Sequence, residues 1–190
     1  MKIVGVVLAA GASSRFGSDK LDHPFGEGLT LGQASARGLA AVVPKCVAVV
    51  RNSDGRLGRE LRALGFMLVE QPQPREGMAA SLARGIGASA DADGWLIALA
   101  DMPAIRQETI RSVYRQLCRG ASIVAPCYRG RRGHPVGFAA RWRTELLALR
   151  GDAGARPVLS RHAAEIDRIE VDDPGILFDI DHVADLTQAP

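Results

Sequence analysis

The sequence has few cysteines and no long apolar run. Its three cysteines, Cys46, Cys118 and Cys127, lie far apart and form no C-x-x-C pair. This spacing fits neither a disulfide framework nor a zinc cluster, and it favours a reducing compartment. No apolar stretch reaches the roughly 18 residues that a membrane-spanning helix needs. The N-terminal apolar stretch is also shorter than that of most signal peptides, so a cytoplasmic protein is expected.

The basic residues are scattered along the chain, and lysine is almost absent. The formal net charge is +3, and the basic residues are interleaved with acids, so no nucleic-acid partner is expected. Of the 24 basic residues only Lys2, Lys20 and Lys45 are lysines, and the other 21 are arginines. A single arginine therefore carries little functional information here, whereas Lys20 carries more because it lies in a loop of small residues.

That loop reads LAAGASSRFGSDK (residues 8–20) and follows the first apolar run. Its glycines and alanines let the main chain approach a ligand whose oxygens accept backbone N–H bonds, and Arg15 and Lys20 can neutralise phosphates. The spacing excludes a P-loop, because five residues separate Gly11 from Gly17 and Lys20 follows three positions later. The G-x-G-x-x-G pattern is missing too. A surface turn with two cations is the alternative interpretation.

Short apolar runs alternate with segments of helical periodicity. The runs, rich in Val, Ile and Ala, predict strands over residues 2–8, 45–50, 66–70, 94–100 and 121–125. Between them the pattern predicts a helix after a Thr30 N-cap, one from an Asp54 N-cap to a stop at Gly65, and others over residues 77–90 and 106–120. This alternation predicts an α/β fold with a mostly parallel sheet. The pattern becomes less regular from His134 onward, where one antiparallel strand is expected. No linker divides residues 1–190, so one domain is expected.

Carboxylates follow the predicted sheet at two points. Asp101 leaves the apolar run LIALA, and ligands of open α/β sheets gather beyond such strand ends. A carboxylate there can hold Mg²⁺, or it can make a turn or cap the helix from about Arg106. In the acidic tail, Asp179 and Asp181 are two apart and point the same way if the segment is extended. They complete a metal site if the tail folds back onto Asp101, and otherwise they face water.

The segment from Leu8 to Lys20 resembles the L-A-A-G-x-S-x-R-x-G-x-x-K signature of the MobA-like NTP transferase family, in its molybdenum cofactor cytidylyltransferase (MocA-like) group. Later blocks are similar to motifs of that group in the same order, so that the resemblance covers almost the whole chain. They are REGMAASLARGI (75–86), LADMP (99–103), YRGRRGHPVGF (128–138), GDAGARPVL (151–159) and DIDHVADL (179–186).

The resemblance implies a Rossmann-like, three-layer α/β/α nucleotidyltransferase with Mg²⁺, or alternatively Mn²⁺, at Asp101. Asp179 or Asp181 would complete the metal site, and Arg15 and Lys20 would hold the triphosphate, so that Arg15, Lys20 and Asp101 are the expected catalytic residues. The residues expected to bind the nucleotide are Leu8, Ala9, Ala10, Gly11, Arg15, Lys20 and Ser81. The cytidylyl members tend to have Ala-Gly where this chain has Ala10-Gly11. A methyl group there would narrow the base pocket, so CTP is preferred over GTP.

The resemblance further implies transfer of CMP to a phosphorylated acceptor, with the molybdenum-bound molybdopterin expected. His134, Arg132 and Arg156 are the expected acceptor-binding residues. The alternatives are a histidine satisfied by the backbone and arginines in solvated loops. A guanylyltransferase, a transferase for another small phosphate and a non-catalytic cofactor carrier for a molybdoenzyme remain open.

Two segments depart from the group's pattern. His182, Val183 and Ala184 stand in the tail where the group usually has T-P-E, which bears on how the tail docks. Asp22 and His23 replace apolar residues, which bears on substrate choice.

Overall fold

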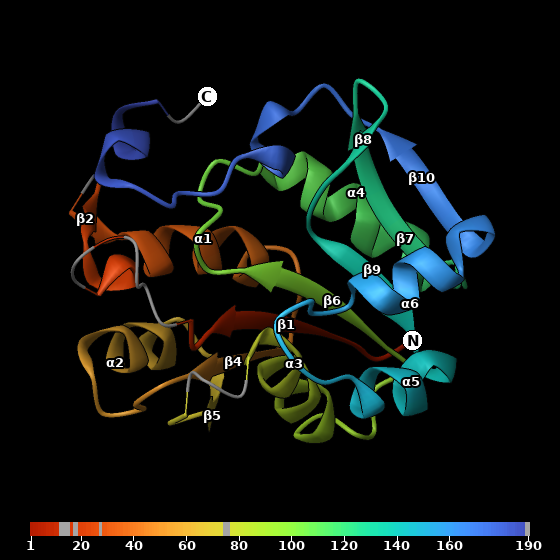
Figure 1. Ribbon diagram of the computed structural model, residues 1–190, viewed down its shortest axis with the longest axis horizontal. Helices are drawn as coiled ribbons and strands as arrows, with labels where there is room; N and C mark the ends of the chain where they lie inside the picture. Colours follow the sequence, from red (N-terminus) through yellow and green to blue (C-terminus); the bar gives the residue numbers. More distant parts are fainter. Residues whose placement is uncertain (12–15, 17–18, 27, 74–76, 189–190) are drawn as a thin grey trace.

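A computed structural model of the chain describes residues 1–11, 16, 19–26, 28–73 and 77–188. Its centre is a mostly parallel sheet in the order β10-β7-β9-β6-β1-β4-β5, drawn in Figure 1. The strands are β1 (Ile3–Ala9), β4 (Cys46–Val50), β5 (Met67–Glu70), β6 (Gly94–Leu99), β7 (Ile123–Tyr128), β8 (Arg131–Arg132), β9 (Val136–Ala139) and β10 (Ile166–Glu170). The predicted α/β class is confirmed, and so is an antiparallel strand after His134. That strand is β9, which lies between β6 and β7, and the short β8 adds a second antiparallel pairing with β7.

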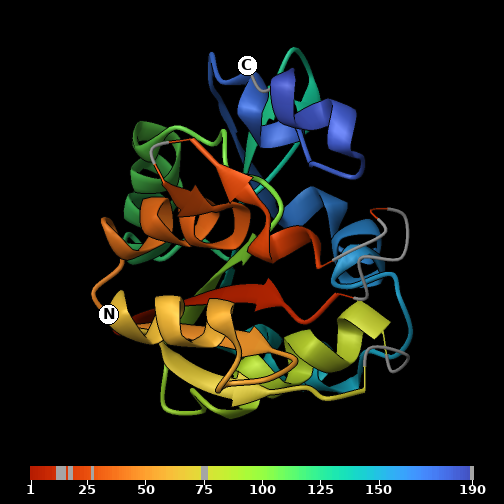
Figure 2. The same ribbon diagram turned by 90° about the vertical axis from the view of Figure 1, so that its left-hand side faces the viewer.

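Helices cover both faces of this sheet, which makes three layers (Figures 1 and 2). One face carries α1 (Leu31–Ala40), α2 (Arg56–Ala63) and α4 (Gln107–Cys118), and the other carries α3 (Gly77–Gly87), α5 (Arg143–Ala148) and α6 (Arg156–Arg161). A hairpin of β2 (Pro24–Phe25) and β3 (Leu29–Thr30) precedes α1. Short 3₁₀ turns are η1 (Lys20–Asp22), η3 (Ala140–Trp142), η4 (Ala163–Glu165), η5 (Pro174–Leu177) and η6 (Val183–Thr187). No helix among the described residues has both the length and the apolarity to cross a membrane.

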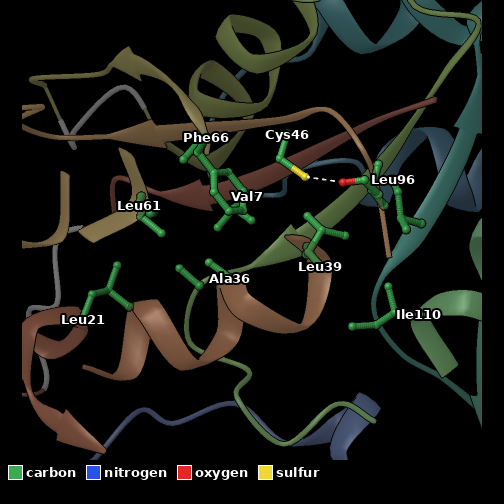
Figure 3. Packing of buried hydrophobic residues seen from close by; sticks show 14 of the residues in the cluster. Val7, Leu21, Ala36, Leu39, Cys46, Leu61, Phe66, Leu96 and Ile110 are labelled. Carbon is green, nitrogen blue, oxygen red and sulfur yellow. Dashed lines mark hydrogen bonds between the residues drawn. The ribbon is translucent and has the colours of Figure 1, made fainter. Parts of the chain in front are cut away.

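Apolar side chains of the sheet pack in two clusters, one on each face. Figure 3 shows part of the first, in which Val7 of β1 and Leu96 of β6 meet Leu39 of α1, and Cys46 donates a hydrogen bond to the carbonyl oxygen of Val43 at 3.4 Å. Cys46 is thus a buried core residue, as its strand context predicts, and burial raises the pKa of its thiol to about 12. The second cluster joins β-strand side chains to α3, α5 and α6. These two clusters fix the strand ends that surround the site.

Of three helix ends with a predicted local signal, two are confirmed and one is not. The Thr30 side chain accepts a hydrogen bond from the Gln33 N–H at 3.2 Å, which confirms the predicted N-cap of α1. Gly65 ends α2 in a left-handed conformation with φ +86°, as predicted. The Asp54 N-cap is wrong, because Gly55 occupies the N-cap position of α2 without a side-chain cap, and Asp54 lies in a turn in which its N–H donates to the Asn52 side chain. The helix therefore begins one residue later, after Gly55.

Candidate active site

The adjacent strands β1 and β6 run parallel, so their carboxyl ends meet at one edge of the sheet. Both arrows point to the left in Figure 1, and this edge faces the viewer in Figure 2. Asp101 follows β6 there, and the C-terminal segment crosses beside it. The N–H of the fully buried Ile180 donates to the carbonyl oxygen of Asp101 at 3.0 Å. This bond holds Asp179 and Asp181 next to Asp101.

Lys20 is paired with two of these carboxylates. Its Nζ lies 3.0 Å from Oδ2 of Asp101 and 3.2 Å from Oδ1 of Asp181, and the residue is only 8% exposed. Burial by itself lowers the pKa of Lys20. The charges of Asp101 and Asp181, and the hydrogen bonds to them, outweigh burial and raise the pKa above its usual 10.5. Lys20 is therefore an ammonium at neutral pH, held among acidic side chains.

The three carboxylates fit a divalent cation. One oxygen from each of Asp101, Asp179 and Asp181 lies within 4.8 Å of the others. Oδ1 of Asp101 is buried and has no hydrogen-bond partner among the described residues. The partial withdrawal of Asp179 from water, and then the charge of Asp101, raise the pKa of Asp179. Three carboxylates with one ammonium leave net negative charge on oxygen donors, which is what Mg²⁺ and Mn²⁺ take as ligands.

A cavity of about 270 Å³ adjoins this cluster and gathers most of the predicted nucleotide-binding residues. Leu8, Ala10, Gly11, Lys20 and Ser81 line it together with Asp101. Ala9 does not line it, because its side chain points to the opposite face of β1 and packs in the core against α1. Arg15 lies outside the described residues. Met78 and Asp152, which lie in the blocks 75–86 and 151–159 that resemble the family, also line this cavity.

A second cavity, of about 340 Å³, opens beside the first and shares Leu8, Met78, Leu99 and Asp152 with it. The three predicted acceptor-binding residues, Arg132, His134 and Arg156, all line it, as does Asp179. Burial, and then the charge of Arg132, lower the pKa of His134 to about 4. His134 is therefore neutral at pH 7. The carboxylate cluster thus lies where two adjoining cavities meet.

The candidate site thus combines a strand end of small residues, a lysine and three carboxylates. Comparison with known protein families assigns the chain that carries it. Residues 5–166 match the model of the MobA-like NTP transferase domain. The chain belongs to this family. It is a nucleotidyltransferase, as its sequence predicts.

Individual relatives agree with this assignment over nearly their whole length. The purine catabolism protein PucB of Bacillus subtilis (strain 168) is 28% identical over 190 residues, which are 94% of this chain and 91% of that protein. A nucleotidyl transferase from Methanothermobacter (Mth528) superposes with a TM-score of 0.81 at 25% identity, over 98% of this chain and 95% of that one. Rv0371C of Mycobacterium tuberculosis, solved in complex with manganese, has the same fold, with a TM-score of 0.77 at 24% identity over 100% and 98% of the chains.

The tail of the transferase lies beside Asp101 although its sequence departs from the family pattern. The N–H groups of Asp181 and His182 both donate to Oδ2 of Asp185, at 2.9 and 2.7 Å. Val183 and Ala184 lie in the 3₁₀ turn η6 that this carboxylate closes. Asp185 thus holds the backbone of Asp181 in place. The tail keeps its position beside Asp101 although residues 182–184 differ from the family pattern.

Asp173 anchors the same tail, and sequence reasoning missed it. This residue is 2% exposed, and its carboxylate accepts hydrogen bonds from the N–H of Arg106 at 2.9 Å, the hydroxyl of Thr109 at 2.6 Å and the N–H of Gly175 at 3.0 Å. The first two groups belong to the start of α4, so Asp173 caps that helix from 67 residues away in the chain. The alternative role considered for Asp101, as the cap before this helix, belongs to Asp173.

Replacing Asp173 by Ala should destabilise the transferase more than any neighbouring surface change. The variant loses three hydrogen bonds to a charged acceptor and leaves the buried Thr109 hydroxyl without this partner. We expect the free energy of unfolding to fall by about 3 kcal/mol, measured by urea unfolding without metal or nucleotide. Asp172→Ala, which removes the exposed adjacent carboxylate, is the control. Equal unfolding midpoints for the two variants would show that Asp173 anchors nothing.

Proposed function

We propose that this transferase moves CMP from CTP to the phosphate group of a small acceptor and releases pyrophosphate. The acceptor that we propose is the molybdenum-bound molybdopterin. The observation that carries the proposal is the meeting of two cavities at the carboxylate cluster. One cavity has the small-residue strand end and Lys20, and the other has Arg132 and Arg156. This arrangement supports separate binding of two anionic substrates, one on each side of the proposed metal ligands.

The donor nucleotide belongs in the first cavity. Gly11 and Ala10 leave the main chain open to base and phosphates, and Ser81 offers a hydroxyl. The methyl group of Ala10 narrows the space for the base, which favours a pyrimidine and hence CTP. Lys20 supplies positive charge to the triphosphate, and Arg15, outside the described residues, is proposed to share this role.

The carboxylates of Asp101, Asp179 and Asp181 would hold Mg²⁺ or Mn²⁺, and the related Rv0371C was solved with manganese. Bound there, the cation would supply charge neutralisation to the phosphates of the nucleotide. Lys20 is the only cation among the described residues that line the first cavity, against two carboxylates, Asp101 and Asp152. A triphosphate entering that space thus meets more negative than positive charge, which supports a requirement for a divalent cation.

The transfer itself needs no general base. A phosphate monoester has a second pKa of about 6, so at pH 7 an oxygen of the acceptor's phosphate is already ionised. This oxygen bonds to the α-phosphorus of CTP. The bond from that phosphorus to the bridging oxygen breaks, and pyrophosphate leaves with the electron pair. Lys20 stabilises the charge that develops on the leaving group. His134, with a pKa of about 4, is a weak base, which agrees with this chemistry.

Pyrophosphate release tests the proposal. Purified protein is incubated with Mg²⁺, the molybdenum-bound pterin and each of the four nucleoside triphosphates in turn. We expect release with CTP alone. Release with GTP alone would keep the mechanism and contradict the role of Ala10. No release with any nucleotide, despite pterin binding by calorimetry, would instead favour a cofactor carrier.

A further inference from the structure

Three arginines from separate elements converge beside the second cavity. Arg132 lies on β8, Arg156 begins α6 and Arg168 lies on β10. Within the described part of the chain, none of the three forms an ion pair with a carboxylate. Arg168 belongs to no family motif that the sequence shows, and nothing in a chain with 21 arginines distinguishes it.

The sheet register places two of these side chains on one face. Arg132 pairs with Cys127 of β7, and Arg168 pairs with Ala125 on the other side of the same strand. Residues two apart on a strand point the same way, so both arginines leave the sheet on one face. Ala125 packs in the cluster that includes α6, so this is the face that Arg156 borders. Figure 1 shows β8, β7 and β10 together at this end of the sheet.

Electrostatics indicates that the three charges are close together. Partial burial, followed by the charges of Arg168 and Arg156, lowers the pKa of the Arg132 guanidinium. Glu170, which pairs with Cys127 on the same face, forms no ion pair with these arginines, and neither do Asp152 and Asp179, which line the second cavity. Like charges held together disfavour one another unless an anion lies between them. Because none of these carboxylates pairs with the three guanidinium groups, their N–H donors are available to an anion.

The arginines reach from the second cavity, beside Asp179, to the edge strand β10. Arg132, Arg156 and Asp179 line the same cavity, and the pKa of His134 responds both to Arg132 and, more weakly, to Asp179. Arg168 lines neither of the two cavities, so the arginines extend away from the carboxylate cluster. A phosphate that attacks the nucleotide must lie near the carboxylates, which leaves the arginines available to another group.

We propose that Arg132, Arg156 and Arg168 bind a second anionic group of the acceptor, distinct from the phosphate that attacks the nucleotide. This inference rests on the proposed function and narrows its acceptor to molecules with two separated anionic groups. Guanidinium groups suit such a site because their paired N–H donors match the oxygens of an oxyanion. Arg168 becomes a specificity residue that the sequence does not reveal.

Arg168→Gln and Arg156→Gln test this site, with Arg111→Gln as the matched control on the exposed surface of α4. The first readout is binding of inorganic phosphate to the nucleotide-free protein by calorimetry. We expect affinity to fall about tenfold or more in each test variant and to stay unchanged in the control. In turnover, KM for the acceptor should rise while KM for CTP stays constant. The melting temperature without phosphate should not fall, because each change removes a repulsive charge, whereas a structural role would lower it.

The outcomes separate the two proposals. Phosphate affinity and acceptor KM equal to those of Arg111→Gln would overturn the inference and leave the transferase function intact. If wild-type protein released no pyrophosphate with any nucleotide, the proposed function would fail, and phosphate binding would still decide whether the arginines form an anion site.

Discussion

Asp101→Asn is expected to lower kcat/KM for pyrophosphate release by about 10³-fold or more. A metal-ligand carboxylate stabilises the charge of the transition state by several kcal/mol, and each 1.36 kcal/mol corresponds to a factor of ten. Asp101 provides one oxygen to Lys20 and a second, buried oxygen that has no partner among the described residues. The amide keeps the size of the side chain and removes its charge, so the loss is electrostatic.

Binding of Mn²⁺ separates this explanation from misfolding. Mn²⁺ should raise the melting temperature of the wild type by mass action on the folded state and should raise that of Asp101→Asn far less. Asp54→Asn, which changes an exposed carboxylate away from the site, should behave as wild type in both assays. A variant at Asp101 that keeps its turnover within tenfold and its stabilisation by Mn²⁺ would exclude Asp101 as a ligand.

The parts of the fold that the sequence predicts are those with strong local signals. β1, β4 and β6 are continuous apolar runs because helices cover both faces of these strands. β10 escaped prediction because it is an edge strand, with the sequence IDRIE and three exposed residues. The helices α5 and α6 have six residues each, which is too short to show a helical period.

The residues of the candidate site also divide into those with a local sequence signal and those without one. The small-residue loop and Asp101 follow apolar strands directly, so local sequence points to them. The proposed metal role of Asp179 and Asp181 depends on the return of the tail to Asp101, and that return rests on contacts such as the cap by Asp173, 67 residues away from its partner. No sequence pattern encodes a contact of that range. The cluster around Arg168 was equally hidden, since it arises from strand register.

Lys20→Met should change two properties in opposite directions. Transfer should fall, with kcat/KM lower by about 10² to 10³, because a positive charge that stabilises the leaving pyrophosphate is lost. Affinity for Mn²⁺ without nucleotide should rise at least about tenfold, because an ammonium no longer repels the cation or binds the oxygens of Asp101 and Asp181. A purely structural lysine would lower both quantities.

The pKa of Lys20 decides where this competition holds. A lysine whose pKa in the folded state is raised stays protonated at neutral pH, and its stabilising contribution is complete below the ordinary 10.5 and lost only as pH rises through the higher folded value. The competition with a cation is therefore constant over pH 6 to 9, a window of about three units that lies below that pKa. Calorimetry with Mn²⁺ over that range checks this, with Lys45→Met, an exposed lysine, as the control.

Competition at Lys20 predicts that the nucleotide assists metal binding. Phosphates that enter the first cavity should attract the ammonium of Lys20 and so free the oxygens of Asp101 and Asp181 for the cation. In wild type, nucleotide should therefore strengthen Mn²⁺ binding, and by linkage Mn²⁺ should strengthen CTP binding by the same factor. In Lys20→Met the carboxylates are free from the start, so this coupling should shrink. Equal coupling in wild type and variant would mean that Lys20 binds phosphate without ever competing with the metal.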